Sequence, residues 1–219
     1  MRPRHELFLD AVAEERQRLS SRRSLLRGSA TVAGAAVLAG GLAVAPAGPA
    51  LRTVMAQAFT DDLDILNYAL TLEHLEYAFY RDGLDLFGAS DFGIGVYDNL
   101  ILVRDHELAH VQTLTQVVSD LGGTPVQEAA YDFGYGNDPD AFLVTAAALE
   151  NTGVSAYDGA GGSIQNSDLV TAAGTIVAVE ARHASYLNLV SGTDVPFPAA
   201  FETPLSREEV LNIAGGFFV

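Results

Sequence analysis

One order of side chains, Glu-x6-Tyr followed by Glu-x-x-His, occurs twice in this chain and constrains its fold more than any other feature. The two copies are Glu73, Tyr80, Glu107 and His110, and then Glu150, Tyr157, Glu180 and His183. Glu and His three positions apart in a helix project from neighbouring points of one face, so each such pair can chelate one metal ion. The repeat therefore predicts two similar halves, each supplying two carboxylates and one imidazole.

Four long segments have the apolar periodicity and the end signals of helices. They cover about residues 60–86, 97–121, 139–157 and 167–190, and the third is expected to end just before Gly159. Ser206 and Glu209 form a capping box that predicts a short fifth helix, and we expect Phe217 and Phe218 to dock on the core. No segment has a convincing strand pattern. The fold class predicted for this region is all-α.

The connections predict the topology of the bundle. The loops after the first and third helices are short, so each of these helices can fold back on the next as an antiparallel hairpin. Residues 122–137, between the second and third helices, span up to ~50 Å at ~3.3 Å per residue, enough to cross a helix of ~36 Å. Two antiparallel hairpins joined by one long crossover are the topology of ferritin-like four-helix bundles.

The first 58 residues read as an export signal rather than as part of the fold. Residues 21–27 (SRRSLLR) resemble a twin-arginine signal, a weakly apolar run follows at 28–50, and residues 56–58 (AQA) offer a cleavage site before Phe59. We predict a cleaved signal over 1–58, the twin-arginine export machinery as a partner, and a folded domain over 59–219. A retained anchor at 28–50 is the alternative, and the protein is then extracellular or held at the cell surface.

Composition excludes several classes of function. Eight of the 12 Arg and four of the 28 acids lie before residue 59, so residues 59–219 carry 4 − 24 = −20 charges and no Lys. Such a surface repels nucleic acid, which is therefore not an expected partner. Together with twin-arginine export it resembles the surfaces of proteins from extreme halophiles. The absence of Cys excludes disulfides, iron–sulfur clusters and thiolate catalysis.

The repeated residues predict a metal site with four carboxylates and two imidazoles. That mixed set of ligands suits iron or manganese rather than a soft metal, and we prefer two iron ions slightly over two manganese ions. Without metal, the buried carboxylates would repel one another and lose their hydration. Three of them follow apolar runs, ALTL before Glu73, AAAL before Glu150 and IVAV before Glu180, so a solvated helix face explains them poorly.

Residues 61–219 resemble the ferritin-like superfamily, and within it the secreted branch of desiccation-related proteins. The segments that carry the resemblance are LEHLE at 72–76, ELAH at 107–110, LENTGV at 149–154 and VEARH at 179–183. The resemblance implies that the metal ligands are Glu73, Glu107, His110, Glu150, Glu180 and His183, with Glu107 and Glu180 bridging. Glu76, one turn after Glu73, is an alternative ligand, although the spacing to Tyr80 favours Glu73.

Four residues near the predicted ligands have two interpretations each. His74 and His106 each precede a predicted ligand directly, which turns them about 100° around the helix. Each has either a surface or helix-interface role, or a contact with a ligand or a substrate. Tyr80 and Tyr157 are either core tyrosines or hydrogen-bond partners of the ligands.

We carry three hypotheses for function. The first is a dimetal-carboxylate oxidoreductase of oxidase, peroxidase or catalase type, which acts on O2, peroxide or Fe(II) and takes any reductant from outside. The second is an exported structural or stress protein without catalysis. In either case the chain can form a homo-oligomer. The third is a zincin metallopeptidase, since His106 to His110 match His-Glu-x-x-His. Residues 111–116 lack the Gly and the third His of that signature, and the second Glu-x-x-His pair would stay unexplained.

Overall fold

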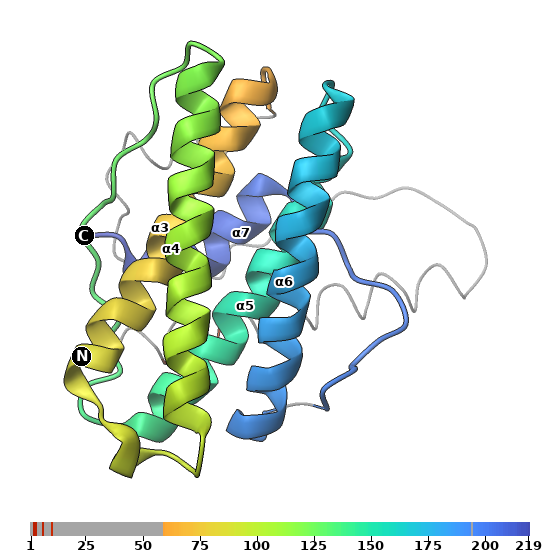
Figure 1. Ribbon diagram of the computed structural model, residues 1–219. Helices are drawn as coiled ribbons and strands as arrows, with labels where there is room; N and C mark the ends of the chain where they lie inside the picture. Colours follow the sequence, from red (N-terminus) through yellow and green to blue (C-terminus); the bar gives the residue numbers. More distant parts are fainter. Residues whose placement is uncertain (1, 4–5, 7–9, 11–58, 194) are drawn as a thin grey trace, which may run out of the picture.

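The computed structural model describes residues 2–3, 6, 10, 59–193 and 195–219. Its four long helices are α3 (Asp62–Leu86), α4 (Val96–Asp120), α5 (Pro139–Gly161) and α6 (Ser167–Ser191), and the short α7 (Arg207–Ala214) follows (Figure 1). No β-strand is present among the described residues. The predicted all-α bundle with a short C-terminal helix is therefore confirmed. The predicted twin-arginine motif, apolar run and cleavage site at 21–58 fall outside the described residues.

The ends of the helices follow from local polar side chains. The N-caps of α3, α5 and α6 are Asp61, Asp138 and Asn166, whose side chains accept hydrogen bonds from backbone N–H groups of the first turn. Ser206 and Glu209 form the predicted capping box of α7. These caps satisfy donors that the helix itself leaves free.

The third helix does not end where the sequence pattern places its end. We expected it to stop at Tyr157, before Gly159, but α5 continues to Gly161. A Cβ atom on Gly159 would lie 1.8 Å from the carbonyl oxygen of Leu205, whose own N–H donates to the Ser155 carbonyl. Gly159 is therefore needed inside the helix for the close approach of a later segment, and it does not terminate the helix.

The four long helices form two antiparallel hairpins. α3 packs against α4, and α5 packs against α6. The connection over residues 121–138 runs along the outside of the bundle, from the end of α4 to the opposite end where α5 begins (Figure 1). The predicted long crossover is thus confirmed. The backbones of α4 and α6 approach each other closely at few positions, in contrast to the helices within each hairpin.

Aromatic rings hold the crossover and the C-terminus against the bundle. Phe79 of α3 stacks on Phe142 of α5 with ring centroids 4.6 Å apart, and Phe133 and Tyr135 of the crossover meet Phe79 edge-on. Phe217 is fully buried and its ring centroid lies 5.5 Å from that of Phe133. The predicted docking of the C-terminal aromatic residues on the core is confirmed. Each such ring pair contributes about 0.5–1.5 kcal/mol beyond the area that it buries.

Arg207 ties α7 to the first turn of α3. Its guanidinium donates to both carboxylate oxygens of Asp64, at 2.7 and 3.0 Å, and lies over the rings of Phe59 and Tyr68. Burial works to raise the pKa of Asp64, but the hydrogen bonds from Arg207 outweigh it and hold that pKa below its ordinary value. The ion pair therefore stabilises the fold while Asp64 is charged.

We expect Arg207→Gln to lower the free energy of unfolding by about 2–3 kcal/mol, because the Asp64 carboxylate then loses the partner of a largely buried ion pair. Arg104→Gln is the control. Arg104 pairs with Asp105 at the surface, so its loss should cost no more than about 0.5 kcal/mol. Urea unfolding of both variants measures the difference, and equal midpoints would contradict the prediction.

The pH dependence of that difference has a defined sign. Because the pKa of Asp64 is lowered in the fold, its contribution is present above the unfolded value of 3.8 and is lost as the pH falls through the folded value. The difference in stability between wild type and Arg207→Gln should therefore shrink as the pH falls below 3.8.

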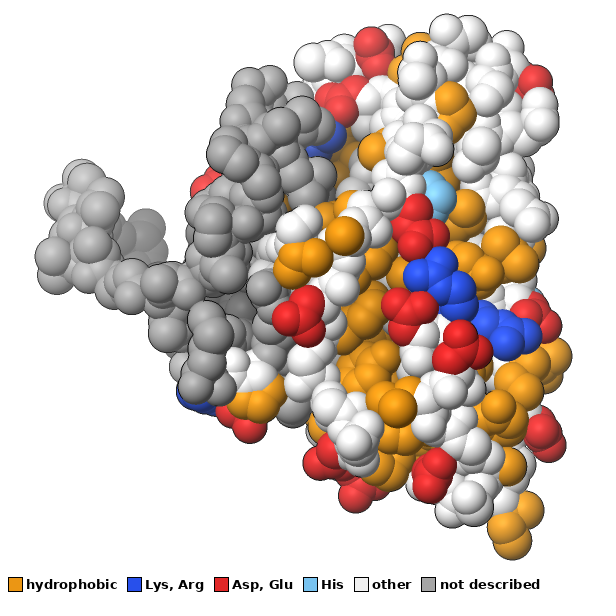
Figure 2. All heavy atoms as spheres, turned by 90° about the vertical axis from the view of Figure 1, so that its left-hand side faces the viewer, with side chains coloured by type: hydrophobic (Ala, Val, Ile, Leu, Met, Phe, Trp, Pro, Cys, Tyr) orange, Lys and Arg blue, Asp and Glu red, His pale blue; other side chains and the backbone are white. Residues whose placement is uncertain are grey.

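The surface of the described part is rich in acids. Figure 2 shows acidic side chains spread over the face in view, with a short row of basic side chains among them. Arg81 contacts Asp82 and Glu128, and Arg104 contacts Asp105. None of the helices in the described part of the chain is long and apolar enough to cross a membrane.

Candidate metal centre

Each long helix places one glutamate in the middle of the bundle. Glu73 of α3, Glu107 of α4, Glu150 of α5 and Glu180 of α6 are all fully buried. Their apolar neighbours on each helix face the core, which carries the carboxylates inward with them. Four acids that are far apart in the sequence therefore meet in one interior cluster.

The first half of the cluster surrounds His110. Its Nδ1 atom lies 2.9 Å from an oxygen of Glu180 and 3.1 Å from oxygens of Glu73 and Glu107. These four residues each offer one ligand atom, and the four atoms lie within 4.8 Å of one another. Three helices thus converge on one point where a cation can be held.

The second half surrounds His183 in the same way. Its Nδ1 atom lies 2.9 Å from Glu107, 3.2 Å from Glu150 and 3.7 Å from Glu180. These residues form a second group of four ligand atoms within 4.8 Å of one another. Glu107 and Glu180 belong to both groups, so the two candidate ion positions share two carboxylates.

Several buried carboxylate oxygens of the cluster are left without a hydrogen-bond donor in the part of the chain that the structure describes. Oε1 of Glu107 and both carboxylate oxygens of Glu180 are buried and have no hydrogen-bond partner among the described residues. The histidine nitrogens approach them, but at angles unsuited to hydrogen bonds. Buried carboxylate oxygens without donors are costly. Oxygen and imidazole ligands suit iron and manganese, so the residues present fit such ions.

Burial and crowding perturb the carboxylates of the cluster. Burial raises the pKa of Glu107 well above its ordinary value, and the charges of Glu180 and Glu150 raise it further. Burial likewise raises the pKa of Glu150, which His183 partly offsets, to about 7. For Glu180, burial and the charge of Glu73 act to raise the pKa, but the close approach of the two imidazoles outweighs them and lowers it below the ordinary value. A cation removes this conflict by charge neutralisation.

The surrounding carboxylates raise the pKa values of the two histidines of the cluster, which favours their charged form. Burial acts to lower the pKa of His110, but its contacts with Glu107, Glu180 and Glu73 raise it to about 12. The pKa of His183 is also raised. Burial acts to lower it, but the nearby carboxylates outweigh burial, and Glu150 contributes most. Without metal, the two imidazoles therefore serve as the cations of the cluster. Binding a metal ion releases their protons.

Two tyrosines cross between the hairpins to hold the carboxylates. Tyr80 of α3 donates a hydrogen bond of 2.6 Å to Glu150 of α5, and Tyr157 of α5 donates to Glu73 of α3. Burial and the neighbouring carboxylates raise the pKa of both phenols, so they remain protonated donors. The sequence repeat places each Tyr seven residues after a Glu on its own helix. In the fold, each Tyr instead bonds the Glu of the other helix.

Glu76 is buried but stands outside both groups of ligand atoms. Burial, followed by the charges of Glu150 and Glu180, raises its pKa well above the ordinary value. Gly153 faces it from α5, and a Cβ atom there would lie 2.8 Å from Oε1 of Glu76. The need for glycine at 153 was missed in the sequence, although an isolated glycine inside a helical pattern was the available signal.

The two uncertain histidines have different partners. The Nδ1 atom of the exposed His106 lies 2.9 Å from Nε2 of His183, and the two rings stack with centroids 5.2 Å apart. His106 therefore contacts a candidate ligand from the solvent side. His74 points to the crossover instead, with Nε2 at 3.3 Å from the Val126 carbonyl oxygen. His106 lies in neither group with His110, which removes the geometric basis of the zincin interpretation.

We expect His106→Ala to weaken metal binding by about tenfold, because Nε2–H of His183 loses the acceptor that orients its ring. His74→Ala is the matched control, since it removes an imidazole on a neighbouring helix that touches no candidate ligand. The dissociation constant for Mn(II), measured by calorimetry, reports the effect. An equal loss in both variants would point to a general loss of stability instead.

Comparison with known proteins agrees with the geometry. A family model described as a ferritin-like domain matches residues 61–193, which is more than half of the chain and includes all six predicted ligands. No curated protein matches the chain.

Proposed function

This chain belongs to the ferritin-like domain family, and from that premise we propose that it is a dimetal-carboxylate redox protein. The observation that carries the proposal is the pair of four-residue groups that share Glu107 and Glu180. Iron is slightly preferred over manganese as the pair of ions. When bound, such a pair supplies electron exchange with O2, peroxide or Fe(II).

The residues of the chain have distinct roles in this proposal. Glu73 and His110 would hold one ion and Glu150 and His183 would hold the other, while Glu107 and Glu180 belong to both groups. Tyr80 and Tyr157 donate hydrogen bonds that orient the outer carboxylates. The surrounding apolar side chains exclude water, which strengthens the attraction between the carboxylates and the ions.

Elemental analysis of the purified protein after reconstitution with Fe(II) or Mn(II) tests the binding. We expect about two ions per chain, and fewer than about one would contradict the proposal. Consumption of O2 and of hydrogen peroxide by the reconstituted protein tests the chemistry. Neither oxidant being consumed would favour the second hypothesis, a structural or stress protein that binds metal without catalysis.

We further propose that the protein is exported through the twin-arginine pathway as a member of the desiccation-related branch. Support comes from the SRRSLLR motif and from the excess of acids in residues 59–219, which keeps a surface hydrated in high salt. Replacing Arg22 and Arg23 by Lys should leave the protein inside the cell, as measured by fractionation. Unchanged secretion would contradict the proposal.

A further inference from the structure

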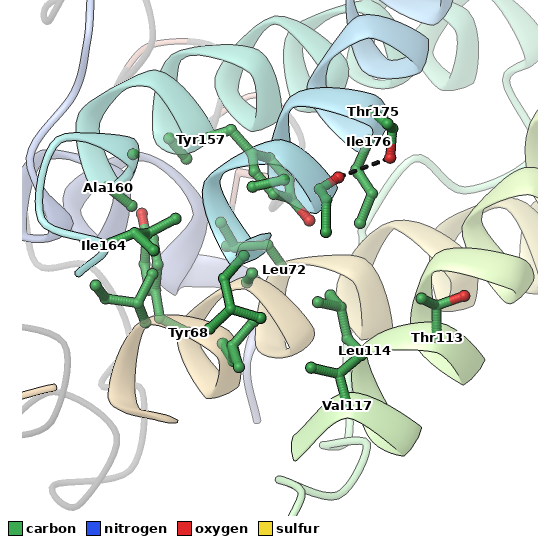
Figure 3. Close-up of a pocket in the computed structure, with 18 residues that line it drawn as sticks. Tyr68, Leu72, Thr113, Leu114, Val117, Tyr157, Ala160, Ile164, Thr175 and Ile176 are labelled. Carbon is green, nitrogen blue, oxygen red and sulfur yellow. Dashed lines mark hydrogen bonds between the residues drawn. The ribbon is translucent and has the colours of Figure 1, made fainter. Parts of the chain in front are cut away.

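An apolar cavity lies between the four long helices, beside the candidate metal centre (Figure 3). Its volume is about 90 Å³. The wall is almost entirely apolar and includes Leu72 of α3, Leu114 and Val117 of α4, Ala160 of α5 and Ile176 of α6. Apolar cavities of this kind stay dry and accept apolar atoms such as xenon.

The inner end of the cavity borders the cluster of carboxylates. Tyr157 lines the cavity, and its hydroxyl donates to Glu73. Leu114 and Ile176 each lie four residues from a candidate ligand on their own helix, which is a rise of about 6 Å. The Tyr157 side chain therefore lies between a molecule at this end and the Glu73 carboxylate.

The outer end reaches the surface at the seam between α4 and α6. Thr113 of α4 and Ala172 and Thr175 of α6 line the cavity and are exposed. The backbones of these two helices approach each other closely at few positions, so side chains fill the space between them. The cavity thus leads from solvent toward the centre.

The side chains that line the cavity can make few hydrogen bonds with a polar molecule inside it. The Tyr157 hydroxyl is already committed to Glu73, and the Thr175 hydroxyl donates to the Ala172 carbonyl at 2.7 Å, the dashed line in Figure 3. Among the described residues of the wall, the Tyr68 hydroxyl is buried without a partner. The Thr113 hydroxyl lies at the exposed mouth, so inside the cavity the Tyr68 hydroxyl alone satisfies only part of a molecule with several donors and acceptors.

We propose that this cavity admits dioxygen to the metal centre and disfavours hydrogen peroxide. The inference rests on the proposed function, in which the centre reacts with an oxidant. Dioxygen is apolar and loses little on leaving water. Each hydrogen bond that a buried peroxide leaves unmade opposes its entry, because the lost hydration is not replaced. The cavity therefore selects between two oxidants that the ligand set alone does not distinguish.

Xenon tests the cavity without any reaction. Crystals under xenon pressure should show an anomalous peak in the cavity of the wild type and of Ala178→Leu, an exposed control on α6. The peak should disappear in Ala173→Leu, because Ala173 lines the cavity and the larger side chain fills it. Ala172→Leu, at the exposed mouth, serves as a second variant in case Ala173→Leu does not fold. A wild-type cavity without xenon would overturn the proposal.

Stopped-flow oxidation of the Fe(II)-loaded protein tests the route. In Ala173→Leu, oxidation by O2 should slow roughly tenfold, equivalent to about 1.4 kcal/mol in the barrier, while oxidation by peroxide and the metal content stay unchanged. Ala178→Leu should match the wild type with both oxidants. Equal slowing with both oxidants, or oxidation of the wild type by peroxide alone, overturns the route but leaves the proposed function intact. A wild type that neither oxidant oxidises overturns both.

Discussion

Glu180→Gln is expected to abolish binding of both metal ions, because Glu180 belongs to both groups of ligand atoms. Glutamine keeps the shape of the side chain but loses the charge that attracts a cation. Glu107→Gln should have the same effect for the same reason. Glu73 and Glu150 each belong to only one group of ligand atoms. Glu73→Gln and Glu150→Gln should therefore each leave about one ion per chain. Elemental analysis after reconstitution and desalting measures this pattern.

Glu76→Gln is the matched control for these variants. Glu76 is a buried glutamate in the same apolar interior, but it belongs to neither group. The variant should retain about two ions per chain. Loss of metal from Glu76→Gln together with retention by Glu73→Gln would reassign the ligand on α3. Thermal melts of the metal-free variants separate loss of a ligand from loss of the fold.

Removing the metal should reverse the pH dependence of stability. Metal-free protein should become less stable between about pH 5 and about pH 8, with a fall in Tm of roughly 5–10 °C at 2–4 °C per kcal/mol. Metal-bound protein should become more stable over the same range. Metal ligands must be deprotonated to bind, so a rising pH strengthens metal binding.

The sign follows from the pKa shifts of the metal-free cluster. Burial raises the pKa of Glu150 from 4.5 to about 7, so the folded chain holds a proton that the unfolded chain releases in that window. Its contribution is fully present below pH 4.5 and is lost as the pH rises through about 7. The raised pKa of His110, from 6.5 to about 12, acts in the same direction at higher pH. The lowered pKa of Glu180 acts oppositely, but only as the pH falls below its unfolded value of 4.5.

Thermal melts at about pH 5, 6, 7 and 8, with chelator or with excess Mn(II), measure this dependence. Glu150→Gln is the control, because it removes one of the buried carboxylates whose raised pKa sets the slope between pH 4.5 and about 7. Its metal-free slope should be flatter than that of the wild type in this window. A metal-free Tm that rises with pH would contradict the prediction.

Much of the fold was predictable because its signals are local. The caps at Asp138 and Ser206 mark helix starts through hydrogen bonds that span two or three residues. The crossover followed from the number of residues between two helices. The end of α5 was predicted wrongly because the role of Gly159 depends on Leu205, which lies far along the chain. A glycine needed for a close approach and a glycine that ends a helix look the same in a sequence.

The sequence by itself determined the four long helices, their pairing in hairpins, and the residue types that a metal site needs at i and i+3. These follow from the period of the helix, which every residue shares. Only the tertiary structure decided that Glu73 rather than Glu76 joins the cluster, that His106 contacts His183, and that a cavity borders the centre. It also decided which tyrosine bonds which glutamate. These contacts depend on how each helix is rotated and tilted against its neighbours, and the packing of the whole core sets that arrangement.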